Sequence, residues 1–203
     1  MLHYVIKMLL NNIIDSKNKM KIIRELSLHE NWDYSINELS KITGIHRVRI
    51  SSAMNPLYNL GVIKIKEKGK VKLISINKEN YFVRNIIIDL FEKEKNLAIN
   101  IANEISKNIK EKNIIAIILF GSAVKDEFKL KSDIDLMIIY NKKIDKKNIE
   151  NIIEEYNKKG LLISYDIIDI KEFRKLFKGK GASIMSMVKY HKILYGKNIL
   201  EMV

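Results

Sequence analysis

Two aspartates, Asp133 and Asp135, stand two residues apart where the apolar run 136–140 begins. A short apolar run bounded by charged residues predicts a buried strand, and successive strand side chains alternate between its two faces. Both carboxylates are therefore expected on one face, where they repel one another unless a cation lies between them. Carboxylate oxygens suit a hard divalent ion, so this pair predicts a Mg²⁺ site.

A Gly-Ser pair, Gly121 and Ser122, precedes these aspartates by about ten residues and follows the apolar run 114–120. The pair therefore lies where a predicted strand ends and a loop or helix begins. A small residue at such a position lets backbone N–H groups approach a phosphate closely. Phosphate oxygens would then complete the coordination of the metal, which predicts a polyphosphate site.

A third carboxylate is available in the later apolar run 161–170, which contains Asp166 and Asp169. These two residues are three apart, so only one of them can share a strand face with the metal pair. The residues alone leave both candidates open.

The order Gly-Ser, ten residues, then Asp-x-Asp between two strands resembles the signature of the DNA polymerase β-like nucleotidyltransferases. The spacing and the short chain are most similar to the minimal nucleotidyltransferases, which include antitoxins that modify a partner toxin. The resemblance implies transfer of a nucleoside monophosphate from an NTP, most commonly ATP, to an acceptor hydroxyl on a protein or nucleic acid.

The resemblance also implies roles for individual residues. Mg²⁺, or Mn²⁺ in its place, would be held by Asp133, Asp135 and a third aspartate inside a strand, which favours Asp166 over Asp169. Gly121 and Ser122 would bind the β- and γ-phosphates. The lysines of the intervening loop would neutralise triphosphate charge, or would serve only as solvated loop residues: Lys125, Lys129 and Lys131.

The first part of the chain predicts a different kind of domain. Helical spacing over 17–29 is followed by the capping-box sequence that begins at Ser35, a turn at Gly44 and a second helix from His46. Alternating polarity over 62–76 then predicts a β-hairpin with a basic tip. This order of elements resembles the winged-helix domains of prokaryotic transcriptional regulators.

Basic residues in this domain are candidates for DNA contacts. Arg47 and Arg49 lie near the start of the second helix, where phosphates or base edges would be met, and Lys68 lies at the hairpin tip. The alternative is that all three are solvated surface residues. Pro56 predicts that the second helix is short, ending near Met54, because proline removes a backbone hydrogen bond.

Composition narrows the function classes. The absence of cysteine excludes disulfides, zinc–thiolate sites and thiol catalysis. No apolar run reaches the roughly 20 residues that span a bilayer, so a cytoplasmic protein without membrane contacts is expected. The net charge of +13 favours nucleotide or nucleic-acid partners, although a lysine-rich composition can also reflect an AT-rich genome or heat adaptation.

The sequence thus predicts an α/β (α+β) protein of two domains: a winged helix over 1–85, and a nucleotidyltransferase domain with a small mixed sheet flanked by helices over 86–203. Residues 80–112 are expected to be helical with a break near 94–96, and 182–195 to form another helix. A second hypothesis is a DNA-binding regulator that uses the nucleotidyltransferase fold to sense nucleotides. Winged helices often dimerise, so a homodimer is an alternative to a monomer.

Overall fold

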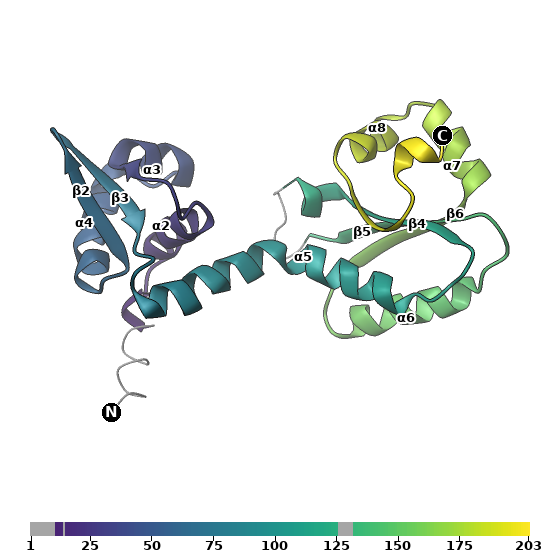
Figure 1. Cartoon of the computed structure of the whole chain (residues 1–203), viewed down its shortest axis with the longest axis horizontal. Coiled ribbons are helices and arrows are strands. Elements are labelled where there is room, and N and C mark those ends of the chain that lie inside the picture. The colour runs from purple at the N-terminus through teal and green to yellow at the C-terminus, as the bar shows by residue number, and fades with distance from the viewer. Residues whose placement is uncertain (1–10, 14, 126–131) are drawn as a thin grey trace. The chain divides into compact units, whose positions relative to one another are not determined.

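The computed structural model describes residues 11–13, 15–125 and 132–203 (Figure 1). Contacts within the chain divide it into two compact units, residues 1–94 and 95–203. The sequence predicted the domain boundary near residue 85. That residue lies within a helical segment that runs from residue 83 to residue 108, and the contacts divide the chain between residues 94 and 95.

The first unit packs helices against a three-stranded antiparallel sheet of strand order β1-β3-β2. A core of isoleucine, leucine and other apolar side chains joins the helices to the sheet. The elements in chain order are α2 (Lys17–Leu28), β1 (Tyr34–Ser35), α3 (Ile36–Thr43), α4 (Arg47–Asn59), β2 (Ile63–Lys68) and β3 (Val71–Ile76).

Local sequence signals set the turn between α3 and α4. The Ser35 hydroxyl accepts a hydrogen bond from the Glu38 N–H, and the Glu38 carboxylate accepts one from the Ser35 N–H, which confirms the capping box. Gly44 ends α3 with a φ of 68°, a conformation that favours glycine. With the β2–β3 hairpin, this helix-turn-helix forms the predicted winged-helix domain.

Pro56 does not end α4, and the prediction of a short second helix is wrong. The helix continues through Pro56 to Asn59. Ala53, Met54 and Leu57 are buried on one side, whereas Pro56 and Ser52, whose carbonyl loses its N–H partner, are both exposed residues. Burial of the apolar side therefore outweighs the lost hydrogen bond.

The helical segment after β3 comprises a π-helical stretch, η1 (Val83–Ile88), and α5 (Asp89–Asn108). The expected break near residues 94–96 is absent, because α5 is continuous there. Residues 94–96 contain no glycine or proline, and the Glu94 carboxylate accepts two hydrogen bonds of 2.9 Å from Arg24 on α2.

The second unit is built on a four-stranded mixed sheet of order β6-β5-β4-β7, in which β5 and β6 pair in parallel and the β4–β5 and β4–β7 pairs are antiparallel. Short helices connect the strands. The elements that follow α5 are β4 (Ile114–Phe120), η2 (Gly121–Val124), β5 (Ile134–Tyr140), α6 (Lys146–Lys158), β6 (Ile163–Asp169), α7 (Ile170–Lys178), α8 (Ala182–Lys189), β7 (Lys192–Gly196) and η3 (Ile199–Glu201).

Helices cover both faces of this sheet (Figure 1). On one face, side chains of α5 and α6 such as Ile105 and Ile153 pack with Leu136 of β5. On the other face, Phe173 of α7 and Ile184 of α8 belong to the core that contains Met137, Ile139 and Ile118. Side chains alternate between the two faces along β4 and β5, so neighbouring residues of these strands pack in two separate cores.

Residues 182–195 are not one helix, which corrects the prediction. The helix α8 ends at Lys189, and β7 follows as an edge strand in which Ile193 pairs with Ile118 of β4. A strand here satisfies backbone groups of β4 that would otherwise be left unpaired in the interior.

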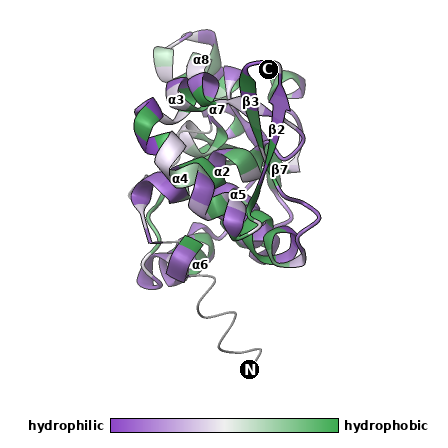
Figure 2. Cartoon of the chain, turned by 90° about the vertical axis from the view of Figure 1, so that its left-hand side faces the viewer, coloured by the Kyte–Doolittle hydropathy of each residue, from purple (hydrophilic) through white to green (hydrophobic). Residues whose placement is uncertain are grey.

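Hydrophilic and hydrophobic segments alternate on helices such as α3 and α5 (Figure 2), as expected for helices with one buried side. In the part of the chain that the structure describes, no helix combines the length and apolar character needed to cross a membrane.

Candidate active site

The end of β4 and the start of β5 bring Gly121 against Asp135. Asp135 lies opposite Phe120 in the β4–β5 register, so its side chain meets the first residue after β4. Gly121 has a φ of 75°, and a Cβ atom built on it would overlap the Asp135 Oδ2. The fold therefore requires glycine at this position both for its backbone conformation and for the space taken by the carboxylate.

Asp133 and Asp135 form an electrostatically strained pair. Asp133 is exposed just before β5, whereas Asp135 is half-buried. Burial, and next the negative charge of Asp133, raise the pKa of the Asp135 carboxyl above its ordinary value. A divalent cation between the two groups would offset both effects, so these residues fit the metal that the sequence predicts.

The two candidates for the third carboxylate have different surroundings. Asp166 is exposed in the middle of β6, directly across from Met137, and strand alternation places it on the same face as Asp135. The Asp169 carboxylate instead accepts a 2.7 Å hydrogen bond from the Lys171 N–H and caps α7. The structure thus makes Asp169 a helix cap, whereas Asp166 lies on the same face of the sheet as Asp135.

Asp166 is not gathered into a closed site with the other two. Among the residues with described positions, no three His, Cys, Asp or Glu side chains are grouped closely enough to hold a metal ion. In the β5–β6 register Asp135 pairs with Ser164, so Asp166 lies two residues, roughly 7 Å, further along the sheet. This spacing leaves room for phosphate or acceptor oxygens between the carboxylates.

The Gly-Ser segment forms a short 3₁₀ helix at the end of β4. The Lys125 N–H donates to the Ser122 carbonyl over 3.2 Å, which closes this turn. The Lys125 ammonium lies 5.3 Å from the centre of the Tyr190 ring. Lys129 and Lys131 lie outside the described residues.

A family assignment follows from the match of the sequence to known domains. The model of the family described as "Polymerase beta, Nucleotidyltransferase" matches residues 101–198, which include the Gly-Ser segment and every aspartate discussed above. Residues 101–198 are a nucleotidyltransferase domain of the polymerase β type.

Several solved structures show a distant likeness to parts of this chain. One is reduced HlyU from Vibrio cholerae N16961, with 13% identity, a TM-score of 0.38 and coverage of 47% of this chain and 90% of that chain. A second is a toxin–antitoxin complex with AMP-PNP, with 18% identity, a TM-score of 0.32 and coverage of 50% of this chain and 74% of that chain. A third is the homodimeric winged helix-turn-helix domain of Mb0332 from Mycobacterium bovis, a possible ArsR-family regulator. It has 14% identity, a TM-score of 0.35 and coverage of 48% of this chain and 84% of that chain. At such low scores these likenesses support no functional conclusion. No curated protein matches the chain significantly.

The candidate DNA-contact residues lie outside the nucleotidyltransferase domain, on the winged helix. Arg47 and Arg49 are exposed in the first turn of α4, and Arg47 donates a 3.3 Å hydrogen bond to the Asn37 side chain of α3. Lys68 is exposed at the end of β2, opposite Val71 in the hairpin. All three side chains are thus accessible, as a DNA contact requires.

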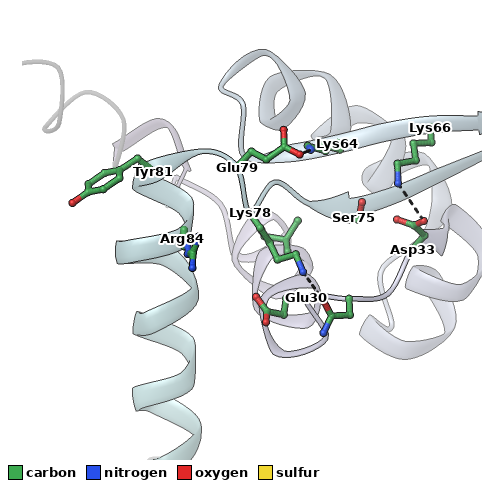
Figure 3. Close-up of a pocket in the computed structure, with 11 residues that line it drawn as sticks. Glu30, Asp33, Lys64, Lys66, Ser75, Lys78, Glu79, Tyr81 and Arg84 are labelled. Carbon is green, nitrogen blue, oxygen red and sulfur yellow. Dashed lines mark hydrogen bonds and ion pairs between the residues drawn. The ribbon is translucent and has the colours of Figure 1, made fainter.

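A cavity of about 570 Å³ lies beside the wing, in the first unit and remote in sequence from the catalytic motif (Figure 3). Its lysines already have partners: Lys64 contacts Glu79 at 2.5 Å, Lys66 contacts Asp33 at 3.8 Å, and Lys78 donates to the Asn31 side chain. Tyr81 points away from these groups in Figure 3. The paired charges make this cavity a weak candidate for an anion site.

Sequence reasoning assigned no role to Tyr190, although its ring contacts Lys125 beside the Gly-Ser segment. The two residues are far apart in the sequence, and residues 182–195 carry a helical pattern that hides the turn at Tyr190. No local signal could have placed this ring near the predicted phosphate site.

Proposed function

We propose that the protein is a metal-dependent nucleotidyltransferase that transfers a nucleoside monophosphate, with AMP the expected group, from an NTP to an acceptor hydroxyl on a protein or nucleic acid. The observation that carries this proposal is the contact of Gly121 with Asp135, next to Asp133, inside a domain of the nucleotidyltransferase family. By the resemblance to antitoxins of this family, a partner toxin is the first protein acceptor to test.

Each residue has a defined task in this reaction. Asp133 and Asp135 would hold Mg²⁺, which would neutralise charge on the triphosphate and the leaving group. Backbone N–H groups at Gly121 and Ser122 position the β- and γ-phosphates. The acceptor oxygen attacks the α-phosphorus, a new O–P bond forms, and the bond to the β-phosphate oxygen breaks to release pyrophosphate. Asp166 receives the proton of the acceptor hydroxyl.

The two aspartates of β6 provide a matched test of this assignment. With ATP labelled at its α-phosphate, Mg²⁺ and cell extract, the wild-type protein is expected to label an acceptor. Asp166→Asn should reduce labelling by roughly 100-fold or more, because it removes the group that takes the proton. Asp169→Asn should keep labelling within about threefold and change stability little, because the asparagine side-chain oxygen can still accept the Lys171 N–H and cap α7.

Nuclease and protease treatment of the labelled product would identify the class of acceptor. If Asp166→Asn labels as well as the wild type and Asp169→Asn does not, the assignment of the third carboxylate is reversed. If no acceptor is labelled with any NTP, even after a candidate toxin partner is added, the enzymatic proposal fails.

A second candidate function is transcriptional regulation through DNA binding. The observation that favours it is the exposure of Arg47 and Arg49 in the first turn of the second helix of a winged-helix domain. The two functions are compatible, since an enzyme of this kind could also bind its own operator. A homodimer would present two such helices to DNA.

Replacing Arg47 and Arg49 together by alanine is expected to weaken DNA binding about tenfold or more. The slope of log affinity against log salt should fall by about 2, because two phosphate contacts are lost. The matched control is Lys64→Ala with Lys66→Ala, which removes the same charge from side chains that already contact Glu79 and Asp33. Fluorescence anisotropy over a salt series measures both quantities. Equal losses in the two double variants would mean that net charge alone, not α4, binds DNA.

A further inference from the structure

The Tyr190 ring lies close to two lysine ammonium groups beside the candidate nucleotidyltransferase site. Its ring centre is 5.3 Å from the Lys125 ammonium and 4.9 Å from the Lys189 ammonium, and the residue is 38% exposed. A hydrogen bond between Lys189 and Tyr190 raises the pKa of Lys189. An exposed aromatic ring that holds two cations is not explained by packing, because core rings are buried and apolar in their contacts.

The fold places this ring on the catalytic face of the sheet. Tyr190 follows α8, whose residues Ile184 and Met187 pack in the same core as Met137, two residues after Asp135 on the same strand face. The strand β7 begins just after Tyr190 and runs antiparallel to β4, with Lys192 opposite Leu119. Because the two strands are antiparallel, residues before Lys192 lie near residues after Leu119. Tyr190 therefore lies near the end of β4, where the Gly-Ser segment starts.

The two lysines connect the ring to the phosphate site. Lys125 is the residue whose N–H closes the turn on Ser122, so its ammonium can reach both the Tyr190 ring and a phosphate bound at this turn. Attraction between an ammonium and a triphosphate exceeds that between an ammonium and an aromatic ring. A bound triphosphate would therefore draw the lysines to its oxygens and leave a ring face open beside the nucleoside.

We propose that Tyr190 stacks on the nucleobase of the NTP while Lys125 and Lys189 contact its triphosphate. This inference rests on the proposed function and adds to it the group that recognises the base. Stacking accepts any base, because every base has a π-face, and it is strongest for purines. The domain is thus expected to bind all four NTPs, with purine nucleotides bound more tightly than pyrimidine nucleotides.

The test separates binding of the base from binding of the phosphates. Dissociation constants for ATP and for inorganic tripolyphosphate are measured with Mg²⁺ by calorimetry for the wild type, Tyr190→Ala and Tyr190→Phe. Tyr190→Ala is expected to weaken ATP binding about tenfold and to leave tripolyphosphate within about twofold. Tyr190→Phe retains the ring and should bind ATP within about threefold of the wild type. The control is Tyr195→Ala, which removes a second exposed tyrosine of the same domain.

Three outcomes would overturn the proposal. If Tyr190→Ala binds ATP as well as the wild type does, the ring does not stack on the base. If it weakens ATP and tripolyphosphate equally, Tyr190 only holds the lysines in place. If the wild type binds tripolyphosphate and ATP equally well, the base is not recognised. If the protein binds ATP tightly but shows no transfer that depends on Asp135, the proposed reaction is refuted. The role of Tyr190 in base binding can still be tested in that case, because it is measured by affinity and not by transfer.

Discussion

The variant Asp135→Asn is expected to lose nucleotidyl transfer by roughly 1,000-fold and to be more stable than the wild type in the absence of metal. The loss follows because the amide cannot hold the cation that neutralises the triphosphate. The gain follows because the ionised Asp135 carboxylate is half-buried beside Asp133, and both effects raise its pKa. Removing this charge relieves desolvation and repulsion together.

The pH dependence of this stability gain has a definite sign. A carboxyl with a raised pKa in the folded state holds its proton more tightly there than in the unfolded chain. The protonated Asp135 carboxyl contributes its full stability below the ordinary aspartate pKa, near 4. This contribution is lost as the pH rises through the raised pKa of the folded state. At pH 7 the melting temperature of Asp135→Asn should therefore exceed that of the wild type, by roughly 2–4 °C, and the difference should shrink near pH 4.

Calorimetric melting curves at both pH values, with and without Mg²⁺, check this expectation. Mg²⁺ should raise the melting temperature of the wild type and have little effect on Asp135→Asn, because binding to the folded state stabilises it. A lower melting temperature for Asp135→Asn at pH 7 would contradict the inference that burial and repulsion from Asp133 destabilise the ionised Asp135 carboxylate. Full transfer activity in the variant would contradict its role in holding the metal.

The second large effect is expected from Gly121→Ala. Alanine at a φ of 75° costs roughly 1–2 kcal/mol, and its Cβ would overlap the Asp135 Oδ2. The carboxylate must then move away from the position that faces Asp133. A displacement of about 1 Å at a reacting centre can reduce the rate about 100-fold, so transfer should fall by at least that factor. Single-turnover transfer of labelled AMP measures the loss.

Gly160→Ala is the matched control, because it imposes the same backbone strain in the same domain. Gly160 has a φ of 85° between α6 and β6, and a Cβ on it would meet no atom within 4 Å. This variant should lose a similar 1–2 kcal/mol of stability and keep transfer within about twofold. Equal loss of activity in both variants would show that strain, and not the contact with Asp135, is responsible.

Local sequence signals predicted much of the architecture, since each depends on only a few neighbouring residues. The capping box at Ser35 and the turn at Gly44 formed as expected. The alternation of apolar and acidic residues at the start of β5 correctly indicated a strand with two different faces. The nucleotidyltransferase family model matches residues 101–198, which contain the motif at residues 121–135.

Tertiary contacts decided the features that local patterns could not. Residues 192–195 belong to the helix that the sequence predicts, yet they form most of β7 because β4 needs a strand partner at that edge. Pro56 stays within α4 because the buried side of that helix outweighs one missing hydrogen bond. In both cases long-range packing overrides a local preference of only a few kcal/mol.

The sequence by itself supplied the candidate residues of the site: a Gly-Ser turn, a pair of aspartates and two candidates for a third carboxylate. The residues alone left Asp166 and Asp169 open and the family resemblance favoured Asp166; the tertiary structure places Asp166 on the sheet face of Asp135 and makes Asp169 the cap of α7. Only it brought the Tyr190 ring to Lys125. The reason is physical: spacing within one strand fixes which side chains share a face, whereas the approach of distant segments depends on the packing of the whole domain.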